Sequence, residues 1–429
     1  MTPAEGLVLM FVGFVFFMLV LSVPVPFALG LTALVTVAAS GKVPLAAVPI
    51  KMVNSMDSFL LIAVPFFILS AELLNTSQIT TRIFNFAGGL VGHVRGGLGH
   101  VNVVGSMLFS GMSGSAVADV AGMGAIEIKA MLDAKYDRDF VAAVTASSAV
   151  VGPIIPPSIP AILYGSIAEV SVGKLFMGGI VPGVLMGLSM MGAVWWVSLR
   201  RGYPAGARVP AGMVVRRFLA ALPSLFAPVL IIGGMMAGIF TPTEASVVAV
   251  LYAAALAVLV YRELSLAALV GCLARSATTM GIFLLMLSTG SVIGLLATRE
   301  RLPALVEQWL QGWTDSPQIA MLLVLGALLV LGCFLDATAI LVMTTPFLAP
   351  LAASLGLDPV HFGILMICVV MIGGITPPFG ILMFLSCQLA GSTMAGFTRA
   401  VVPFLIVLLA VVLLVAFVPE TVLFLASRY

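Results

Sequence analysis

Hydroxyl and carboxyl side chains stand at two glycine-marked turns inside long apolar stretches, and their oxygens could bind a cation. The first turn, residues 111–119, carries Ser113 and Ser115. The second, residues 332–338, carries Asp336 and Thr338, with Asp336 at the position of Ser115. A carboxylate within an apolar, membrane-length segment is destabilising unless it is paired or binds a cation. Oxygen-only donors suit a hard cation such as Na⁺.

Each turn is followed, further along the chain, by a break of glycines and paired prolines. The first break includes Gly152 and Pro156, and the second includes Gly374, Thr376 and Pro377. Proline has no N–H to donate, so it frees a carbonyl of the preceding helical turn. Within a bilayer such a break is tolerated where protein or a water-filled cavity surrounds it. Two breaks in corresponding positions indicate the ion and substrate site of a secondary transporter, and their exposed helix N-termini favour an anionic substrate group.

The chain repeats itself at a constant spacing. Subtracting 152 from 373, the positions of two break glycines, gives an offset of 221. The same offset pairs other identical residues: Gly111 with Gly332, Pro156 with Pro377, Pro157 with Pro378, and Pro182 with Pro403. We predict two repeats, residues 1–205 and 216–429, joined by a linker at 206–215. Each is expected to contain scaffold helices, a surface arm (42–58 or 262–276), a re-entrant hairpin (96–124 or 324–345) and a broken helix.

Composition places the chain in a membrane. It is 62% hydrophobic and 8% charged, with a mean hydropathy of +1.23, whereas soluble domains carry about 25% charged residues. Several apolar runs approach the roughly 20 residues that a membrane-spanning helix needs. We therefore expect an all-α polytopic membrane protein. The net charge of +2 gives no reason to expect nucleic acid, and the four cysteines are expected to pack as small hydrophobic residues.

Arginines set the predicted orientation. Residues 200–217 hold five arginines and no acid, which predicts a cytoplasmic linker. Five crossings in each repeat then place both termini outside. An odd number of crossings turns the second repeat upside down relative to the first, which predicts an inverted repeat.

Simpler interpretations remain open for several of these features. The small residues of the first turn could serve close helix packing, and one proline pair could be only a structural kink. Asp119 could cap the following helix or pair locally. The charged residues between 127 and 139 are expected to form a solvated face, His100 to lie at a membrane edge, and Glu244 and Asp358 to stand at helix ends. The chain has no nucleotide-binding loop, zinc-protease motif or nucleophile elbow, so we do not expect an enzyme.

Residues 109–119 and 152–160, with the second-half motif 373–380, resemble the large membrane subunit of TRAP (tripartite ATP-independent periplasmic) transporters along essentially the whole chain. The resemblance implies an elevator-type transporter of the bacterial inner membrane, driven by a Na⁺ gradient and importing organic acids such as carboxylates. It implies two partners, a small four-helix membrane subunit and a periplasmic substrate-binding protein. Arg299 and Arg301 would be candidates for docking the binding protein.

When the family's motifs are matched to this sequence position by position, the resemblance implies two sodium regions, with the substrate between the hairpin tips. Ser113 and Ser115 would bind Na⁺ with the break that contains Gly152 and Pro156. The second region comprises Asp336, Thr338, Gly374, Thr376 and Pro377. Two rival interpretations remain, a stand-alone sodium–dicarboxylate symporter that needs no binding protein, and a channel.

Overall fold

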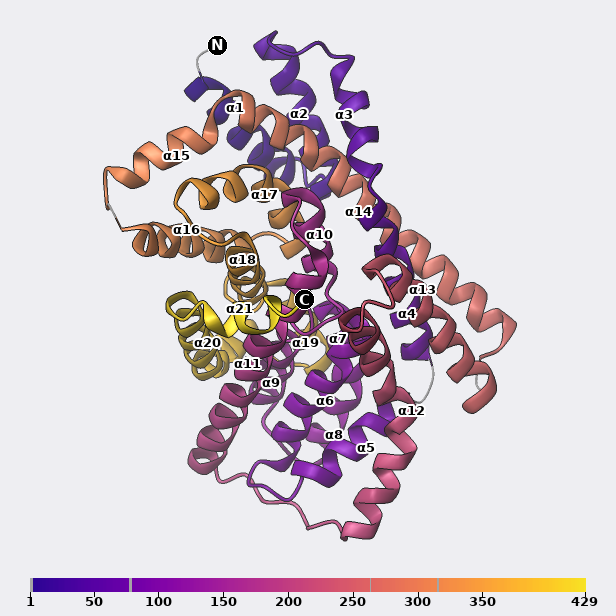
Figure 1. Ribbon diagram of the computed structural model, residues 1–429. Helices are drawn as coiled ribbons and strands as arrows, with labels where there is room; N and C mark the ends of the chain where they lie inside the picture. Colours follow the sequence, from indigo (N-terminus) through magenta and orange to yellow (C-terminus); the bar gives the residue numbers. More distant parts are fainter. Residues whose placement is uncertain (1–2, 77–78, 263, 315) are drawn as a thin grey trace.

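The computed structural model describes residues 3–76, 79–262, 264–314 and 316–429 (Figure 1). These residues form helices and no strand, apart from one isolated bridge between Arg95 and Ala205. Within the described ranges, six helices are long and apolar enough to cross a membrane, or seven if a bent pair counts as one span. The six are Val172–Arg201, Ala211–Met236, Pro242–Val260, Leu266–Arg299, Ala337–Ser354 and Met394–Phe417. The prediction of an all-α membrane fold is confirmed.

The α-helices of the first half are α1 (Pro3–Val15), α2 (Val25–Ser40), α3 (Ala47–Met56), α4 (Ala63–Thr76), α5 (Ile79–Val91), α6 (Gly97–Ser113), α7 (Ala116–Asp119), α8 (Ala125–Asp133), α9 (Arg138–Ala149), α10 (Ile159–Ala168) and α11 (Val172–Arg201). Those of the second half are α12 (Ala211–Met236), α13 (Pro242–Ala255), α14 (Leu266–Arg299), α15 (Leu302–Gln311), α16 (Pro317–Gly332), α17 (Ala337–Ser354), α18 (Pro359–Gly373), α19 (Ile381–Ala390), α20 (Met394–Phe417) and α21 (Glu420–Ala426).

The helices recur at the spacing found in the sequence. Adding 221 to 116 and 133, the first residue of α7 and the last of α8, gives 337 and 354, the bounds of α17. The peptide bonds Pro156–Pro157 and Pro377–Pro378, also 221 apart, are both cis. In Figure 1, α5 and α8 lie toward one end of the molecule, whereas their counterparts α15 and α17 lie toward the other. The second half therefore repeats the helix order of the first, and these matching helices lie toward opposite ends of the molecule.

Matching caps begin the broken helix of each half. The Asp137 carboxylate accepts the N–H groups of Asp139 and Phe140 at the start of α9. Asp358, 221 residues later, accepts those of Val360 and His361 at the start of α18. Because a side-chain acceptor satisfies the otherwise free N–H groups of a first turn, these aspartates fix where each helix begins. The prediction that Asp358 stands at a helix end is confirmed.

The halves differ in their arms. In the first, α3 is bent by 60° from the helical segment that follows it. In the second, residues 266–299 form a single helix, α14, of 34 residues. The predicted arm 262–276 is therefore not a separate element, and most of it forms the start of α14. Ser265 caps this helix by accepting the Ala268 N–H, and no proline or glycine pair interrupts the turns that follow. Ion pairs join this helix to the first half, Arg275 with Glu72 and Lys42 with Glu300, each at 2.8 Å.

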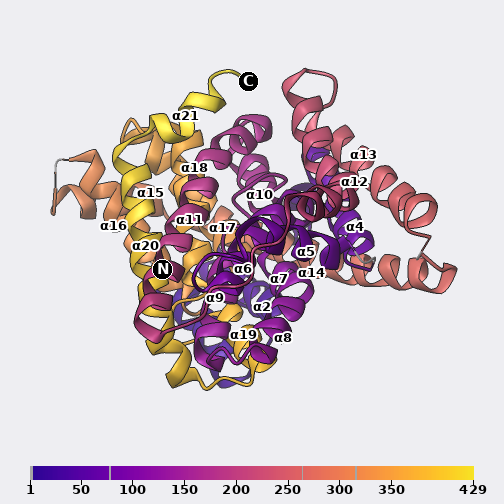
Figure 2. The ribbon, with the colours of Figure 1, turned by 90° about the horizontal axis from the view of Figure 1, so that it is seen from below.

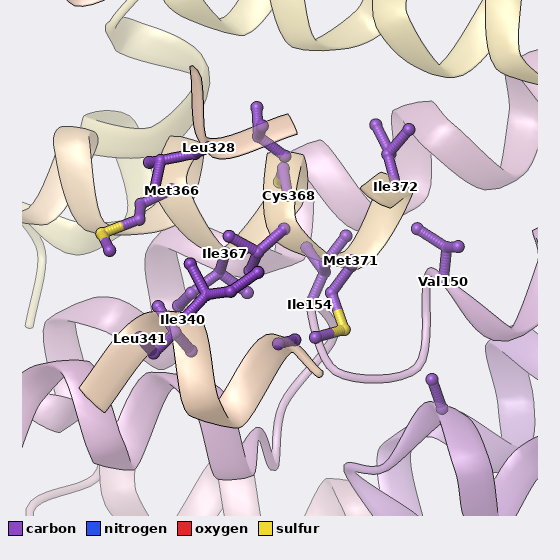
Figure 3. Packing of buried hydrophobic residues seen from close by; sticks show 14 of the residues in the cluster. Val150, Ile154, Leu328, Ile340, Leu341, Met366, Ile367, Cys368, Met371 and Ile372 are labelled. Atoms are coloured by element: carbon purple, nitrogen blue, oxygen red, sulfur yellow. The ribbon is translucent and has the colours of Figure 1, made fainter. Parts of the chain in front are cut away.

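The interior is apolar and extends across both halves. Phe140, Tyr164 and Phe404 are fully buried, and Figure 3 shows Ile340, Ile367 and other residues of α17 and α18 packed together. All four cysteines are buried and none of them forms a disulfide, which agrees with the prediction that they pack as small hydrophobic residues. Large hydrophobic side chains stay exposed along outward-facing helices, including those on α1, α12 and α20, as a surface in contact with lipid requires. Figure 2, seen from below, shows α12 and α13 on the opposite side from α16 and α20.

Candidate functional site

A cavity of about 200 Å³, here called the central cavity, lies where both hairpins, both breaks and helices α4 and α14 meet. Four residues of the predicted set line it: Ser115, Asp336, Thr338 and Gly374. The structure thus brings together hydroxyl and carboxyl groups that are more than 200 residues apart in the chain. The opposite wall is apolar and includes Phe283 of α14.

The tip of the first hairpin rests directly on the first break. Gly114 ends α6 with φ of 60°, a left-handed conformation that suits glycine. A Cβ at Gly114 would lie 2.4 Å from the carbonyl oxygen of Pro157, so no larger residue fits. The Ser115 hydroxyl then caps α7 by accepting the Ala118 N–H at 3.4 Å. Beside them, the buried Ser113 hydroxyl has no hydrogen-bond partner among the described residues, which leaves its oxygen available to a ligand.

The first break turns the chain between α9 and α10. Pro156 has no N–H, so the Gly152 carbonyl lacks its helical donor. Ser158 closes the turn, because its hydroxyl donates to the Pro153 carbonyl and accepts the Ala161 N–H at the start of α10. Gly152 and Pro156 border the hairpin tip rather than the central cavity, whose lining from this break begins at Pro153.

The second hairpin meets its break through two glycines. A Cβ at Gly332 would lie 2.8 Å from the Cα of Gly373, so backbone contacts backbone. Asp336 caps α17 by accepting the Thr338 N–H at 2.9 Å. The Thr376 hydroxyl donates to the Ile372 carbonyl at 2.8 Å, and neither Thr376 nor Pro377 lines the central cavity. The second cluster at the cavity therefore comprises Asp336, Thr338 and Gly374.

The donor set fits a hard cation. The Asp336 carboxylate has about four acceptor positions and uses one for its helix cap. The Thr338 hydroxyl lies beside it in the lining, and the Ser113 hydroxyl lies in the same hairpin as Ser115. The lining contains no lysine, arginine or histidine among the described residues. An anion in the central cavity would thus be stabilised by a cation bound near Asp336 and by the positive N-terminal ends of α10 and α17.

Sequence reasoning missed the wall that α4 and α14 contribute. Ile68, Thr279, Phe283 and Met286 line the central cavity. Their types give no signal, because apolar residues and isolated threonines occur on every face of a membrane helix. The position of these four residues in the cavity wall becomes visible only when the hairpin tips are seen packed against α4 and α14.

Two expectations for polar residues of the first half, those for Glu127 and His100, are wrong, and the open alternative for Asp119 is not supported. Asp119 neither caps the next helix nor forms an ion pair among the described residues, and it is buried. Glu127 is fully buried instead of solvated, and His100 is buried instead of interfacial. All three lie in the hairpin α6–α8, which neighbouring helices enclose. Glu244, in contrast, forms the predicted helix end, in a capping box with Thr241.

An all-helical membrane protein with two repeated hairpins and two broken helices meeting at a shared cavity belongs to the class of secondary transporters. Residues 12–421 match the family described as the DctM component of the tripartite ATP-independent periplasmic transporters. The chain belongs to this family. This confirms the prediction made from the proline breaks and the hairpin turns of the sequence.

Its relatives include large permeases named for different substrates. It is 41% identical to the sialic acid TRAP transporter large permease protein SiaM of Vibrio cholerae, over 88% of this chain and 89% of that one. It is 37% identical to the 2,3-diketo-L-gulonate large permease protein YiaN of Escherichia coli, over 87% and 88%. It is 34% identical to the C4-dicarboxylate large permease protein DctM of Pseudomonas aeruginosa, over 91% and 92%.

The fold also resembles a solved structure. The YdaH transporter of Alcanivorax borkumensis superposes with a TM-score of 0.58, covering 88% of this chain and 89% of that one, at 13% identity. At this identity the likeness concerns the fold alone.

Proposed function

We propose that this chain is the large permease subunit of a Na⁺-coupled, binding-protein-dependent transporter that imports organic acids across the bacterial inner membrane. The observation that carries the proposal is the central cavity, whose described lining includes one carboxylate and three hydroxyl side chains and no basic one. Such a site binds a small cation first and an anion beside it. The relatives named for sialic acid, 2,3-diketo-L-gulonate and C4-dicarboxylates support an organic acid as the anion.

The proposed ion regions follow the two hairpin tips. Ser113 and Ser115, next to the break at Gly152, form the first. Asp336 and Thr338, next to Gly374, form the second. The free hydroxyl of Ser113 and the unused acceptor positions of Asp336 support these assignments. Bound Na⁺ would supply the positive charge that the substrate carboxylate needs, while the protein oxygens orient the ion.

The proposed movement is that of an elevator. The hairpins and broken helices would slide against a scaffold that includes α4 and α14. The scaffold wall of the central cavity is largely apolar, with Ile68, Phe283 and Met286 facing the tips, and apolar contacts without fixed hydrogen bonds favour sliding. If Na⁺ must bind before the substrate site forms, only the fully loaded domain crosses, and the ion gradient sets the direction of transport.

Two partners belong to the proposal. The family is tripartite, which supports a small membrane subunit of four helices and a soluble periplasmic substrate-binding protein. Arg299 and Arg301 lie on the predicted outer side, at the end of α14 and beside it. Positive charge there would attract an acidic surface of the binding protein.

The test is uptake into proteoliposomes that contain this chain and its small subunit. Labelled organic acids are offered with and without the cognate binding protein, under an inward Na⁺ gradient or with K⁺ in its place. We expect accumulation that requires both Na⁺ and the binding protein. Accumulation without the binding protein would make the chain a stand-alone symporter, and flux that does not saturate would make it a channel.

A further inference from the structure

A second, larger cavity of about 890 Å³ lies farther along α14, toward the end that carries Arg299. Its lining on α14 runs from Leu287 to Thr298, whereas the central cavity ends at Met286. At 1.5 Å per residue, the midpoints of the two stretches are about 15 Å apart along the helix. We call this space the outer vestibule, because every loop that borders it is on the predicted outer side. Its polar lining includes Lys51, Asn54, Asp57, Ser166, Glu169 and Ser291.

The outer vestibule differs in charge from the central cavity. It holds one ammonium group, on Lys51, and two carboxylates, on Asp57 and Glu169. All three residues are exposed, and none takes part in an ion pair with another described residue. Hydroxyl and amide side chains also line the outer vestibule. Each charge therefore remains available to a solute that enters from the outside.

We propose that the outer vestibule binds a hydroxylated monocarboxylic acid, such as a sugar acid, before the acid reaches the central cavity. The Lys51 ammonium would hold the single carboxylate. The carboxylates of Asp57 and Glu169, which only accept hydrogen bonds when ionised, would accept them from the hydroxyls of the acid. This inference rests on the proposed function and narrows its substrate class.

The same lining disfavours a small dicarboxylate. One ammonium group can neutralise one carboxylate of such a ligand, and the second would face Asp57 or Glu169, where like charges repel. A dicarboxylate also lacks the hydroxyls that these two side chains could bind. Size points in the same direction, because a volume of 890 Å³ lies within the range of sites for drug-sized ligands.

The lining of the outer vestibule comes from both the proposed scaffold and the proposed sliding part. Helices α3 and α14 line it together with α10 and α17, which belong to the first broken helix and the second hairpin. The hydroxyls of Ser58 and Ser166 meet across it at 3.1 Å, joining the segment before α4 to α10. A shift of one part against the other would therefore change the space and release the bound acid.

Direct binding tests the proposal on the chain and its small subunit in lipid nanodiscs. The probes are D-gluconate, N-acetylneuraminate and succinate, each titrated by calorimetry in Na⁺-free buffer. We expect the two hydroxylated monocarboxylates to bind and succinate to bind at least tenfold more weakly. Lys51→Gln should weaken binding of the hydroxylated acids about tenfold or more. Lys174→Gln, an exposed lysine outside the vestibule, is the matched control and should leave binding unchanged.

A second variant separates the two cavities. Asp336→Ala, in the central cavity, should leave Na⁺-free binding intact. The proposal is overturned if succinate binds as tightly as gluconate, if Lys51→Gln has no effect, or if Asp336→Ala alone abolishes binding. Uptake by the same preparations tests the proposed function separately. If uptake requires Na⁺ and the binding protein but Lys51→Gln does not weaken binding, only the binding site in the outer vestibule is refuted. If Lys51→Gln weakens binding but no such uptake occurs, only the proposed Na⁺ coupling is refuted.

Discussion

The two hairpins share a backbone plan and differ in their surroundings. In the first, 13 of the 17 residues of α6 are buried, against 6 of 16 in α16 of the second. A polar ladder joins α6 to α9. Asn102 donates to the Thr145 hydroxyl and accepts from the Ser148 hydroxyl, both at 2.7 Å, and Ser106 donates to Ser148 at 3.1 Å.

Among the residues that the structure describes, the second hairpin has no counterpart of this ladder. Leu323 and Ala327, which correspond to Asn102 and Ser106, are exposed on α16. Helix α16 packs against α18 instead, and the apolar residues Leu328 of α16 and Ile367 of α18 belong to the same buried cluster (Figure 3). Polar side chains thus appear where other helices enclose the hairpin and supply hydrogen-bond partners. Apolar side chains appear where the hairpin meets lipid, because a polar group without a partner is costly there. The glycine turns and proline breaks occur in both halves and determine the fold. Whether a hairpin is surrounded by helices or by lipid determines which other residue types it carries.

The largest effect is expected at Asp336, the carboxylate that stands where the first hairpin tip has Ser115. Asp336→Ala should reduce Na⁺-driven uptake by about 10–100-fold or more, the range for a lost metal-site group. Asp336→Asn should be equally inactive while keeping the α17 cap, because asparagine caps helices as well as aspartate does. The control is Asp358→Asn, which alters the cap of α18 away from the central cavity. Wild-type uptake by Asp336→Ala would remove this carboxylate from the mechanism.

The glycine contact of the second tip gives the next largest effect. Gly332→Ala would place a Cβ 2.8 Å from the Gly373 backbone, so its cost should exceed the roughly 1–3 kcal/mol typical of overpacking. Gly326→Ala, on the same helix with no atom within 4 Å of its Cβ, should be neutral or stabilising by about 0.5–1 kcal/mol. Thermal unfolding in detergent compares the two. Equal stability of both variants would mean that hairpin and break are not in contact.

The polar ladder of the first hairpin predicts a moderate loss. Asn102→Leu, the residue type found at position 323, should lower the free energy of unfolding by about 1–3 kcal/mol, because Thr145 and Ser148 lose buried partners. Leu323→Ala, on the exposed side of α16, should change it by no more than about 0.5 kcal/mol. If both variants unfold alike, enclosure does not explain the difference between the hairpins.

The smallest effect concerns the unpartnered hydroxyl of the first tip. Ser113→Ala should be neutral in K⁺ and should weaken Na⁺ binding about tenfold, which removes about 1.4 kcal/mol of the stabilisation by Na⁺. The measurement is the midpoint of thermal unfolding as a function of Na⁺ concentration. Ser198→Ala is the control, because the Ser198 hydroxyl is also buried and has no hydrogen-bond partner in the described part of the chain, but it lies near the end of α11. A Na⁺ response unchanged in Ser113→Ala would place the ion elsewhere.

The sequence was sufficient to predict the features that depend on unusual backbone. Glycines at 114 and 332 and the proline pairs have few structural uses in apolar segments, so their positions located the hairpin tips and breaks. The offset of 221 then predicted counterparts such as Asp336 for Ser115. Both residues line the central cavity.

Features that depend on packing between distant helices could not be predicted. The enclosure of the first hairpin buries His100 of α6 and Glu127 of α8, although the charges around position 127 resemble a solvated loop. The α14 wall was missed because its residues resemble those of any membrane helix. The single helix across 266–299 replaced a predicted arm because polar residues near its start do not by themselves interrupt a helix.

The length of α14 has a consequence for the surrounding lipid. At 1.5 Å per residue its 34 residues extend about 51 Å, against a hydrocarbon core about 30 Å thick. The helix therefore crosses the molecule obliquely, as Figure 1 shows. A thinner bilayer favours a larger tilt and a thicker one a smaller tilt. Since Thr279 and Phe283 lie on this helix, the acyl-chain length of the host membrane acts on one wall of the central cavity and should tune the rate of transport.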